Sequence, residues 1–123
     1  MLNQTLLVGR IVETPKINKT KNENDFSSIT LAVPRDYPNK DGVYEADFID
    51  LIAFDKKQLN KMEHLLKGDL VIVNASLSTR WGEKEGQRTK YTDIKINNID
   101  FLKSSKNQEK TMANDEMEEE IDK

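Results

Sequence analysis

Apolar and polar residues alternate along much of the chain with a period of two, which indicates β-strands rather than helices. In residues 28–33 the apolar side chains Ile29, Leu31 and Val33 hold every second position. Side chains on a strand point alternately to its two faces, so one face of this stretch is expected to pack inward and the other to face outward. Related signals predict four further strands, over residues 5–12, 46–54, 70–81 and 88–101.

One segment has the longer period of a helix. Leu59 and Met62, together with the two leucines that follow them, recur at helical spacing. Asp55, just before this segment, is a favourable N-cap residue, and Gly68, just after it, is typical of a helix end. These signals predict one helix, over residues 56–67, between the third and fourth strands.

Polar segments separate the predicted elements. Residues 18–25, 34–42 and 82–86 are rich in Asn, Asp, Gly, Pro, Lys or Glu and are expected to form loops and turns. From residue 104 onward the chain is mostly polar or acidic and has no aromatic residue. Such a segment buries too little apolar area to offset its conformational entropy. We therefore predict a folded domain over residues 1–103 and a disordered acidic tail over residues 104–123.

Composition narrows the class of protein. The 123 residues include no cysteine, which excludes a disulfide framework and a thiolate metal site. No apolar stretch approaches the roughly 20 residues that a helix needs to span a bilayer. We expect a soluble cytoplasmic protein with no membrane contact. His64 is the single histidine, so no metal site, cofactor or catalytic residue is predicted.

The formal charge of −3 is unevenly distributed. Residues 1–103 carry 16 basic and 15 acidic side chains, a net +1, whereas residues 104–123 carry 3 and 7, a net −4. A body this close to neutral exerts no strong long-range attraction on a polyanion. Any nucleic-acid contact must therefore come from local clusters of cations and from stacking.

Four aromatic residues lie in or beside the predicted strands, where the pattern places their rings on an open sheet face: Tyr37, Phe48, Phe54 and Trp81. Exposed rings are costly unless something covers them, and unpaired nucleobases stack on them readily. The pattern therefore favours a single-stranded nucleic-acid binder. The alternatives are structural: Phe54 as a core residue at a strand end, Trp81 as the anchor of a loop, and Tyr37 as an ordinary turn residue.

Strand, strand, strand, helix, strand, strand is the element order of the oligonucleotide-binding (OB) fold, a five-stranded Greek-key barrel that is all-β apart from one helix between strands three and four. Five segments also resemble the bacterial and phage single-stranded DNA-binding proteins in order and spacing: LLVGR at 6–10, ITLA at 29–32, DFIDLIAFDK at 47–56, LKGD at 66–69 and STRW at 78–81. The resemblance spans about residues 4–102.

The resemblance implies roles for individual residues. The base-stacking rings would be Trp81, Phe48, Phe54 and Tyr37, and the phosphate contacts would be Lys56, Lys67, Arg10 and Arg80, with Lys90 beside Tyr91 as a further candidate. Asp50 departs from the family, which often has a basic residue at this place. Its carboxylate would repel phosphate unless a neighbouring Lys or Arg pairs with it.

The tail also departs from the cellular members of the family. It is acidic, but it ends in Ile121, Asp122 and Lys123 rather than in a Pro-Phe tip, which favours a phage or plasmid protein. The tail has two possible roles: it would bind a replication or recombination protein, or compete with DNA for the predicted basic contacts. The residues concerned are its acidic run and the apolar residue beside it, Glu118, Glu119, Glu120 and Ile121.

The function that these features imply is the sequence-independent binding and protection of single-stranded DNA in replication, recombination or repair, by a homodimer or homotetramer without catalysis. One alternative is an OB-fold adaptor of a replisome or primosome that binds protein and only weakly binds nucleic acid. RNA is a further alternative ligand, because stacking rings do not distinguish ribose from deoxyribose.

Overall fold

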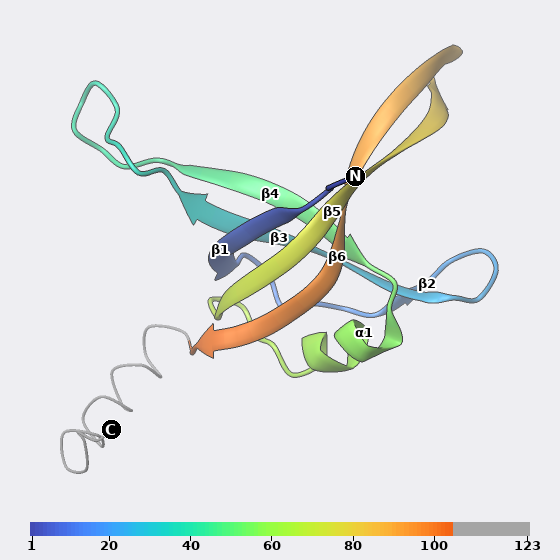
Figure 1. The fold of residues 1–123 in the computed structure, drawn as a ribbon, viewed down its shortest axis with the longest axis horizontal. Helices are drawn as coiled ribbons and strands as arrows, with labels where there is room; N and C mark the ends of the chain where they lie inside the picture. Colours follow the sequence, from blue (N-terminus) through green and yellow to red (C-terminus); the bar gives the residue numbers. More distant parts are fainter. Residues whose placement is uncertain (105–123) are drawn as a thin grey trace.

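The computed structural model describes residues 1–104 and has one helix and six strands in this part of the chain (Figure 1). The elements are β1 (Thr5–Ile11), β2 (Asn18–Lys19), β3 (Asp25–Pro34), β4 (Ala46–Ala53), α1 (Lys56–Met62), β5 (Leu70–Lys84) and β6 (Gln87–Lys103). The five longer strands and the helix are those that the pattern predicts. The two-residue β2 is additional, and it pairs with the start of β3 inside the segment predicted as a loop.

Strand pairing closes the sheet into a barrel. The strands lie in the order β1-β5-β6-β4-β3-β2, and β1 also pairs with β3. That closing contact joins Arg10 to Ala32 and Ile11 to Leu31. β4 meets β6 in the parallel direction, and the other pairs are antiparallel. The five-stranded barrel with one helix confirms the predicted OB fold.

The inward faces of the strands and one side of the helix form the core. Its buried members are Ile11, Ile29, Leu31, Leu51, Ala53, Leu59, Met62, Leu65, Val71, Val73, Ala75, Ile96 and Ile99. Full burial of a Val, Leu, Ile or Met side chain contributes roughly 1.5–3 kcal/mol. The helix is fastened to the barrel by a buried polar side chain as well, because the Gln58 side-chain carbonyl accepts a hydrogen bond of 2.9 Å from the Ile99 backbone N–H.

The helix is shorter than predicted. It begins where expected, and the Asp55 carboxylate accepts a hydrogen bond from the Gln58 backbone N–H at its N-terminus. It ends at Met62 rather than at residue 67, and the chain continues in turns with Gly68 at φ +92°. Leu65 is buried without being helical, so the apolar spacing that extended the prediction is satisfied by a turn. No helix within residues 1–104 is long and apolar enough to cross a membrane.

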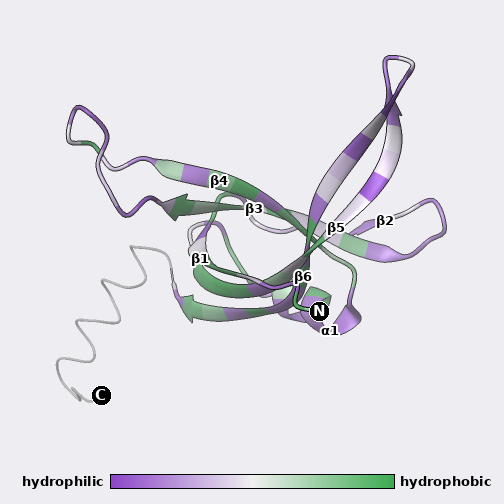
Figure 2. Ribbon diagram, turned by 45° about the horizontal axis from the view of Figure 1, so that its top comes forward, coloured by the Kyte–Doolittle hydropathy of each residue, from purple (hydrophilic) through white to green (hydrophobic). Residues whose placement is uncertain are grey.

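A long hairpin of β5 and β6 extends away from the barrel (Figure 1, yellow and orange). Its two-residue turn, Glu85 and Gly86, has φ values of +52° and +82°. This is the backbone of a type I′ hairpin turn, whose twist matches that of the flanking strands. Gly82 therefore lies within β5 and not in the predicted turn. The far end of the hairpin is mainly polar, in contrast to the apolar strands of the barrel (Figure 2).

Candidate nucleic-acid interface

The outer face of β4 carries a ring that the barrel leaves uncovered. Phe48 is 68% exposed and lies on the same side of the strand as Asp50 and Ile52, while Leu51 points into the core. Its cross-strand neighbour on β3 is Ala32, whose methyl group covers little of the ring. Phe48 therefore has the open position predicted for it.

Phe54 follows the last residue of β4 and is 47% exposed, so it is not the core residue of the alternative interpretation. The ring of Phe26 lies beside it, with 6.2 Å between centroids and 34° between planes. The ammonium of Lys95 lies 5.7 Å from the Phe54 centroid. Two aromatic rings and a cation therefore lie together at the end of β4.

Trp81 lies on the β5–β6 hairpin and is 56% exposed. Its cross-strand partner is Lys90, whose ammonium is 5.8 Å from the centroid of the indole. The guanidinium of Arg88 is nearer, at 4.1 Å, a cation–π distance. The hairpin thus presents an exposed indole ring with two cations beside it.

Arg80 does not share this side of the hairpin, because neighbouring residues of a strand point to opposite faces. Its Nε donates a 2.8 Å hydrogen bond to Asp93 Oδ2, and its guanidinium lies 4.7 Å from the ring of Tyr91. Arg80 lines a hollow with Phe54 and Ile52. It therefore faces Phe54 and β4 rather than flanking Trp81.

Two adjoining hollows form a groove between β4 and the base of the hairpin, each of about 340 Å³. They share Ile52, Arg80 and Asp93. One also includes the ring pair Phe26 and Phe54, and we call this groove the β4–β6 groove. It has an apolar floor, aromatic residues at one end and charged groups at its middle.

Asp50 lies at the other end of the β4–β6 groove. The sequence left open whether a neighbouring Lys or Arg pairs with its carboxylate. The partner in the described part of the chain is instead the Thr30 hydroxyl, which donates to Asp50 Oδ1 from the facing position on β3. The sequence could not identify this partner, because Thr30 is 20 residues away along the chain and meets Asp50 only through strand pairing.

The predicted phosphate contacts do not form one cluster. Arg10 Nη1 donates to the Gly68 carbonyl at 2.9 Å, near the junction between α1 and β5. Lys67 precedes that glycine, and its backbone N–H donates to the Thr14 hydroxyl. Lys56 is exposed in the first turn of α1. None of the three lines the β4–β6 groove, whereas Arg80 does.

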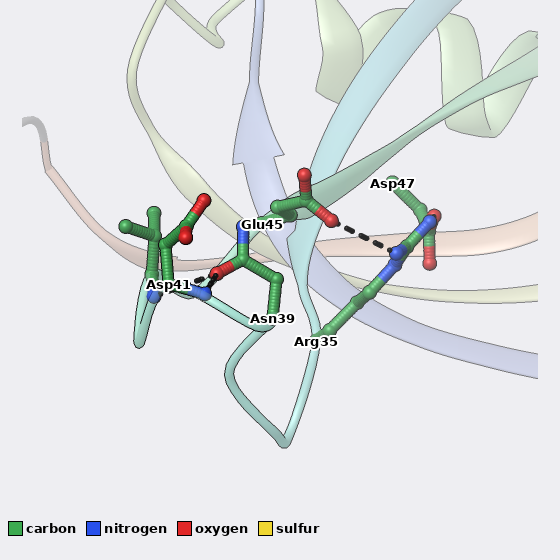
Figure 3. A network of polar contacts seen from close by, with 6 residues as sticks. Arg35, Asn39, Asp41, Glu45 and Asp47 are labelled. Carbon is green, nitrogen blue, oxygen red and sulfur yellow. Dashed lines mark hydrogen bonds and ion pairs between the residues drawn. The ribbon is translucent and has the colours of Figure 1, made fainter.

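Tyr37 lies in the long loop between β3 and β4, which forms an exposed arm, and is itself exposed. An ion-pair network ties the base of the arm together (Figure 3). Arg35 Nη2 donates to Asp47 Oδ1 at 2.9 Å, and Nη1 donates to Glu45 Oε1 at 3.2 Å. The hydrogen bond and charge of Asp47 raise the pKa of Arg35 above its ordinary value. Within the arm, Asn39 Oδ1 accepts a backbone hydrogen bond (Figure 3).

The comparison with known proteins agrees with this fold. The sequence model of the single-strand binding protein family matches residues 2–102. The chain belongs to this family. The resemblance inferred from the five sequence segments is thereby confirmed.

Two curated relatives illustrate how similar this chain is to other members of the family. Single-stranded DNA-binding protein 1 of Staphylococcus aureus (strain MSSA476) is 43% identical over 103 residues, which are 83% of this chain and 66% of the relative. Single-stranded DNA-binding protein 2 of Staphylococcus aureus (strain COL) is 39% identical over 108 residues, 87% of this chain and 78% of the relative. The chain therefore spans just under two thirds of the length of the first relative.

A solved structure, the Plasmodium falciparum SSB complex with ssDNA, shares the fold with a TM-score of 0.69. It is 24% identical, and the alignment covers 83% of this chain and 96% of that one.

Sequence reasoning missed three side chains that lie beside the exposed rings: Phe26, Lys95 and Arg88. Phe26 lies on the same outward face of the strand as Ser28 and Thr30, so the alternation of the sequence could have identified it. Lys95 and Arg88 gave no local signal, because the rings that they approach belong to other strands. The predicted tail contacts, Glu118 to Ile121, lie outside the described residues.

Proposed function

We propose that this protein binds single-stranded DNA, with bases stacking on Phe48, Phe54 and Trp81 and with nearby cations contacting phosphates. The observation that carries the proposal is that these three rings are exposed on or beside a closed sheet. Two of them, Phe54 and Trp81, have a cation within 6 Å of the ring centroid. Stacking on an aromatic side chain contributes roughly 1–3 kcal/mol per base and tolerates any base.

The names of the relatives and the DNA in the solved complex support the same ligand. The proposal extends to a role in replication, recombination or repair in the cytoplasm, without catalysis, by a homodimer or homotetramer. Tyr37, Lys90 and Arg80 are included as DNA contacts on the strength of their exposure or their place in the β4–β6 groove. Arg10, Lys56 and Lys67 are assigned to DNA that continues beyond the groove.

A fluorescence titration tests the proposal, because Trp81 is the single tryptophan of the chain. Adding a thymidine oligomer should quench the indole as a base stacks on it, and the affinity should fall as salt rises. A gel shift of Trp81→Phe provides the control, since phenylalanine keeps a stacking surface but removes the signal. Absence of both quenching and a gel shift at low ionic strength would remove single-stranded DNA binding as the function.

One observation favours a protein-binding adaptor as the second candidate. The described body is close to neutral, and its outer face carries the carboxylates of Asp50 and Asp93. An adaptor would leave Trp81 unquenched by DNA. A uridine oligomer in the same titration tests RNA as the ligand, and tighter binding to uridine than to deoxyuridine would favour RNA.

A further inference from the structure

The β4–β6 groove has an unusual feature for a surface that contacts DNA. One end and the middle of the groove carry carboxylates: Asp50 lies at that end, and Asp93 lies where the two hollows meet. A carboxylate repels phosphate, while Arg80 and Lys95 line the same groove and offset the charge of the two carboxylates. A nearly neutral groove with aromatic rings in its lining suits an uncharged base better than a phosphate group.

The groove has the shape and walls for a base. Its aromatic hollow, of about 340 Å³, is within the range of sites for small ring systems. The Phe26 and Phe54 rings form one wall, and Ile52 lies on the floor. These groups cover the apolar face of a flat ring, while the polar edge of that ring reaches the carboxylate at the middle of the groove.

Asp93 is held in a fixed position by its neighbour. Its Oδ2 accepts a 2.8 Å hydrogen bond from Arg80 Nε, and the Arg80 guanidinium is in turn fixed by its 4.7 Å contact with the Tyr91 ring. Its Oδ1 accepts no hydrogen bond from residues 1–104, and the side chain is 26% exposed. This oriented carboxylate oxygen, open to the groove, is available to accept a hydrogen bond from a ligand.

The edges of the bases differ in what they offer such an acceptor. Cytosine, adenine and guanine carry an exocyclic amino group that donates, and carboxylates are known to accept from the cytosine amino group. Thymine has a carbonyl oxygen at the corresponding place, which a carboxylate repels, and its one donor on this edge, the N3–H, lies between two carbonyl oxygens. Asp50 adds negative potential from the other end of the groove, which increases the difference.

We propose that the β4–β6 groove is a base subsite that prefers bases with an exocyclic amino group, with Asp93 as the residue that determines the preference. This inference rests on the proposed binding of single-stranded DNA, and it adds a bias of base composition to it. Arg80 positions Asp93 and shields part of its charge, so that a base edge and not a metal ion or phosphate is the fitting ligand.

The test compares two oligomers of equal length, thymidine and 5-methyldeoxycytidine, at pH 8. These bases have the same ring size and the same methyl group, and they differ in the carbonyl or amino group at position 4 and in the protonation of N3. The full-length protein should bind the 5-methylcytosine oligomer about fivefold more tightly, the effect of one hydrogen bond to a charged group partly offset by solvent. Equal affinities, or tighter binding of thymidine, would overturn the inference.

Variants separate base recognition from simple charge effects. Asp93→Asn should remove the preference, because an amide both donates and accepts, and should bind thymidine more tightly than the wild type does. Asp100→Asn is the matched control, since it removes one negative charge outside the groove, beside Lys61, and should leave the preference unchanged. If Asp93 serves only to orient Arg80 toward phosphate, Asp93→Asn will weaken both oligomers equally, and that result would also overturn the inference.

The comparison of the two oligomers needs no variant, so it stays decisive even where Asp93→Asn fails to fold. Asp50→Asn provides an independent second variant and should reduce the preference without abolishing it. Failure of both oligomers to bind is a different result, because it removes the proposed function together with the subsite. Binding of both without preference removes the subsite alone.

Discussion

At the residue scale, two of the exposed rings, Phe54 and Trp81, are each paired with a cation from another strand. Lys95 approaches Phe54, and Arg88 approaches Trp81. A cation over one side of a ring leaves the other side for a base, and it also places positive charge where the phosphate beside a stacked base lies. Under the proposed function, the same few residues supply both stacking and charge neutralisation.

Replacing Phe54 by alanine should weaken binding of a DNA oligomer by about 1–3 kcal/mol, because one stacking surface is lost. The melting temperature of this variant should change little, since the ring is 47% exposed. Phe101→Ala is the control: this ring is 52% exposed but lies in the hollow between α1 and β6, where binding should not change. Isothermal titration of both variants measures the difference. Equal losses of affinity would show that Phe54 has no specific contact with DNA.

The contacts of the Asp100 carboxylate predict that the stability of the protein depends on pH. Hydrogen bonds from Lys61 and then Asn98 hold the pKa of its carboxyl below the ordinary value of 3.8. Because the folded-state pKa is the lower one, the stabilisation is complete above the unfolded-state value and is lost as pH falls through the folded-state pKa. Urea unfolding of the wild type and of Asp100→Asn should therefore converge in acid, below about pH 4. Lys61→Met should reduce the difference at neutral pH, and a constant difference at every pH would contradict the assignment.

At the element scale, β1 determines whether the barrel closes, because it pairs with β5 along its length and with β3 at its end. The two strands β1 and β3 approach each other closely at Gly9. A Cβ atom there would lie 2.7 Å from the Ala32 carbonyl oxygen, which belongs to the backbone of β3. Glycine is required at this point by the closeness of two strands and not by a turn.

Gly9→Ala should therefore lower the free energy of unfolding by about 1–3 kcal/mol, the usual cost of forcing an extra methyl group into a packed site. Gly82→Ala is a matched control in the hairpin, where the added methyl would lie 2.9 Å from the edge of the Tyr91 ring. A side chain moves more easily than a backbone, so this variant should lose less stability. Urea unfolding measures both, and an equal or larger loss for Gly82→Ala would contradict the explanation.

At the scale of the whole molecule, charge is divided between a nearly neutral body and an acidic C-terminal segment. Residues 1–103 have a net charge of +1 and residues 104–123 a net charge of −4. Under the proposed function, a weakly charged domain depends on stacking for much of its affinity, and an acidic segment on the same chain lowers the net attraction for DNA. The oligomeric state stays a prediction at this scale, and light scattering with and without DNA measures it.

Removing residues 105–123 should tighten DNA binding at low ionic strength, because it changes the net charge from −3 to +1. The gain should disappear near 1 M salt, where the screening length is about 3 Å. Replacing Glu118, Glu119 and Glu120 by glutamine at full length is the control, and it should give part of the gain. Affinity that is unchanged by both alterations would exclude competition between this segment and DNA.

The sequence by itself determined the five long strands, the start of the helix and the outward rings of β4, because alternation and capping are local and can be read from adjacent residues. The end of the helix was misjudged, since Leu65 satisfies a helical spacing from within a turn. Tertiary structure alone decided which groups meet: Phe26 and Lys95 at Phe54, Thr30 at Asp50, and Arg80 with Asp93 in the groove. These contacts depend on strand register and barrel closure, which join residues far apart in the chain and leave no periodic signal along it.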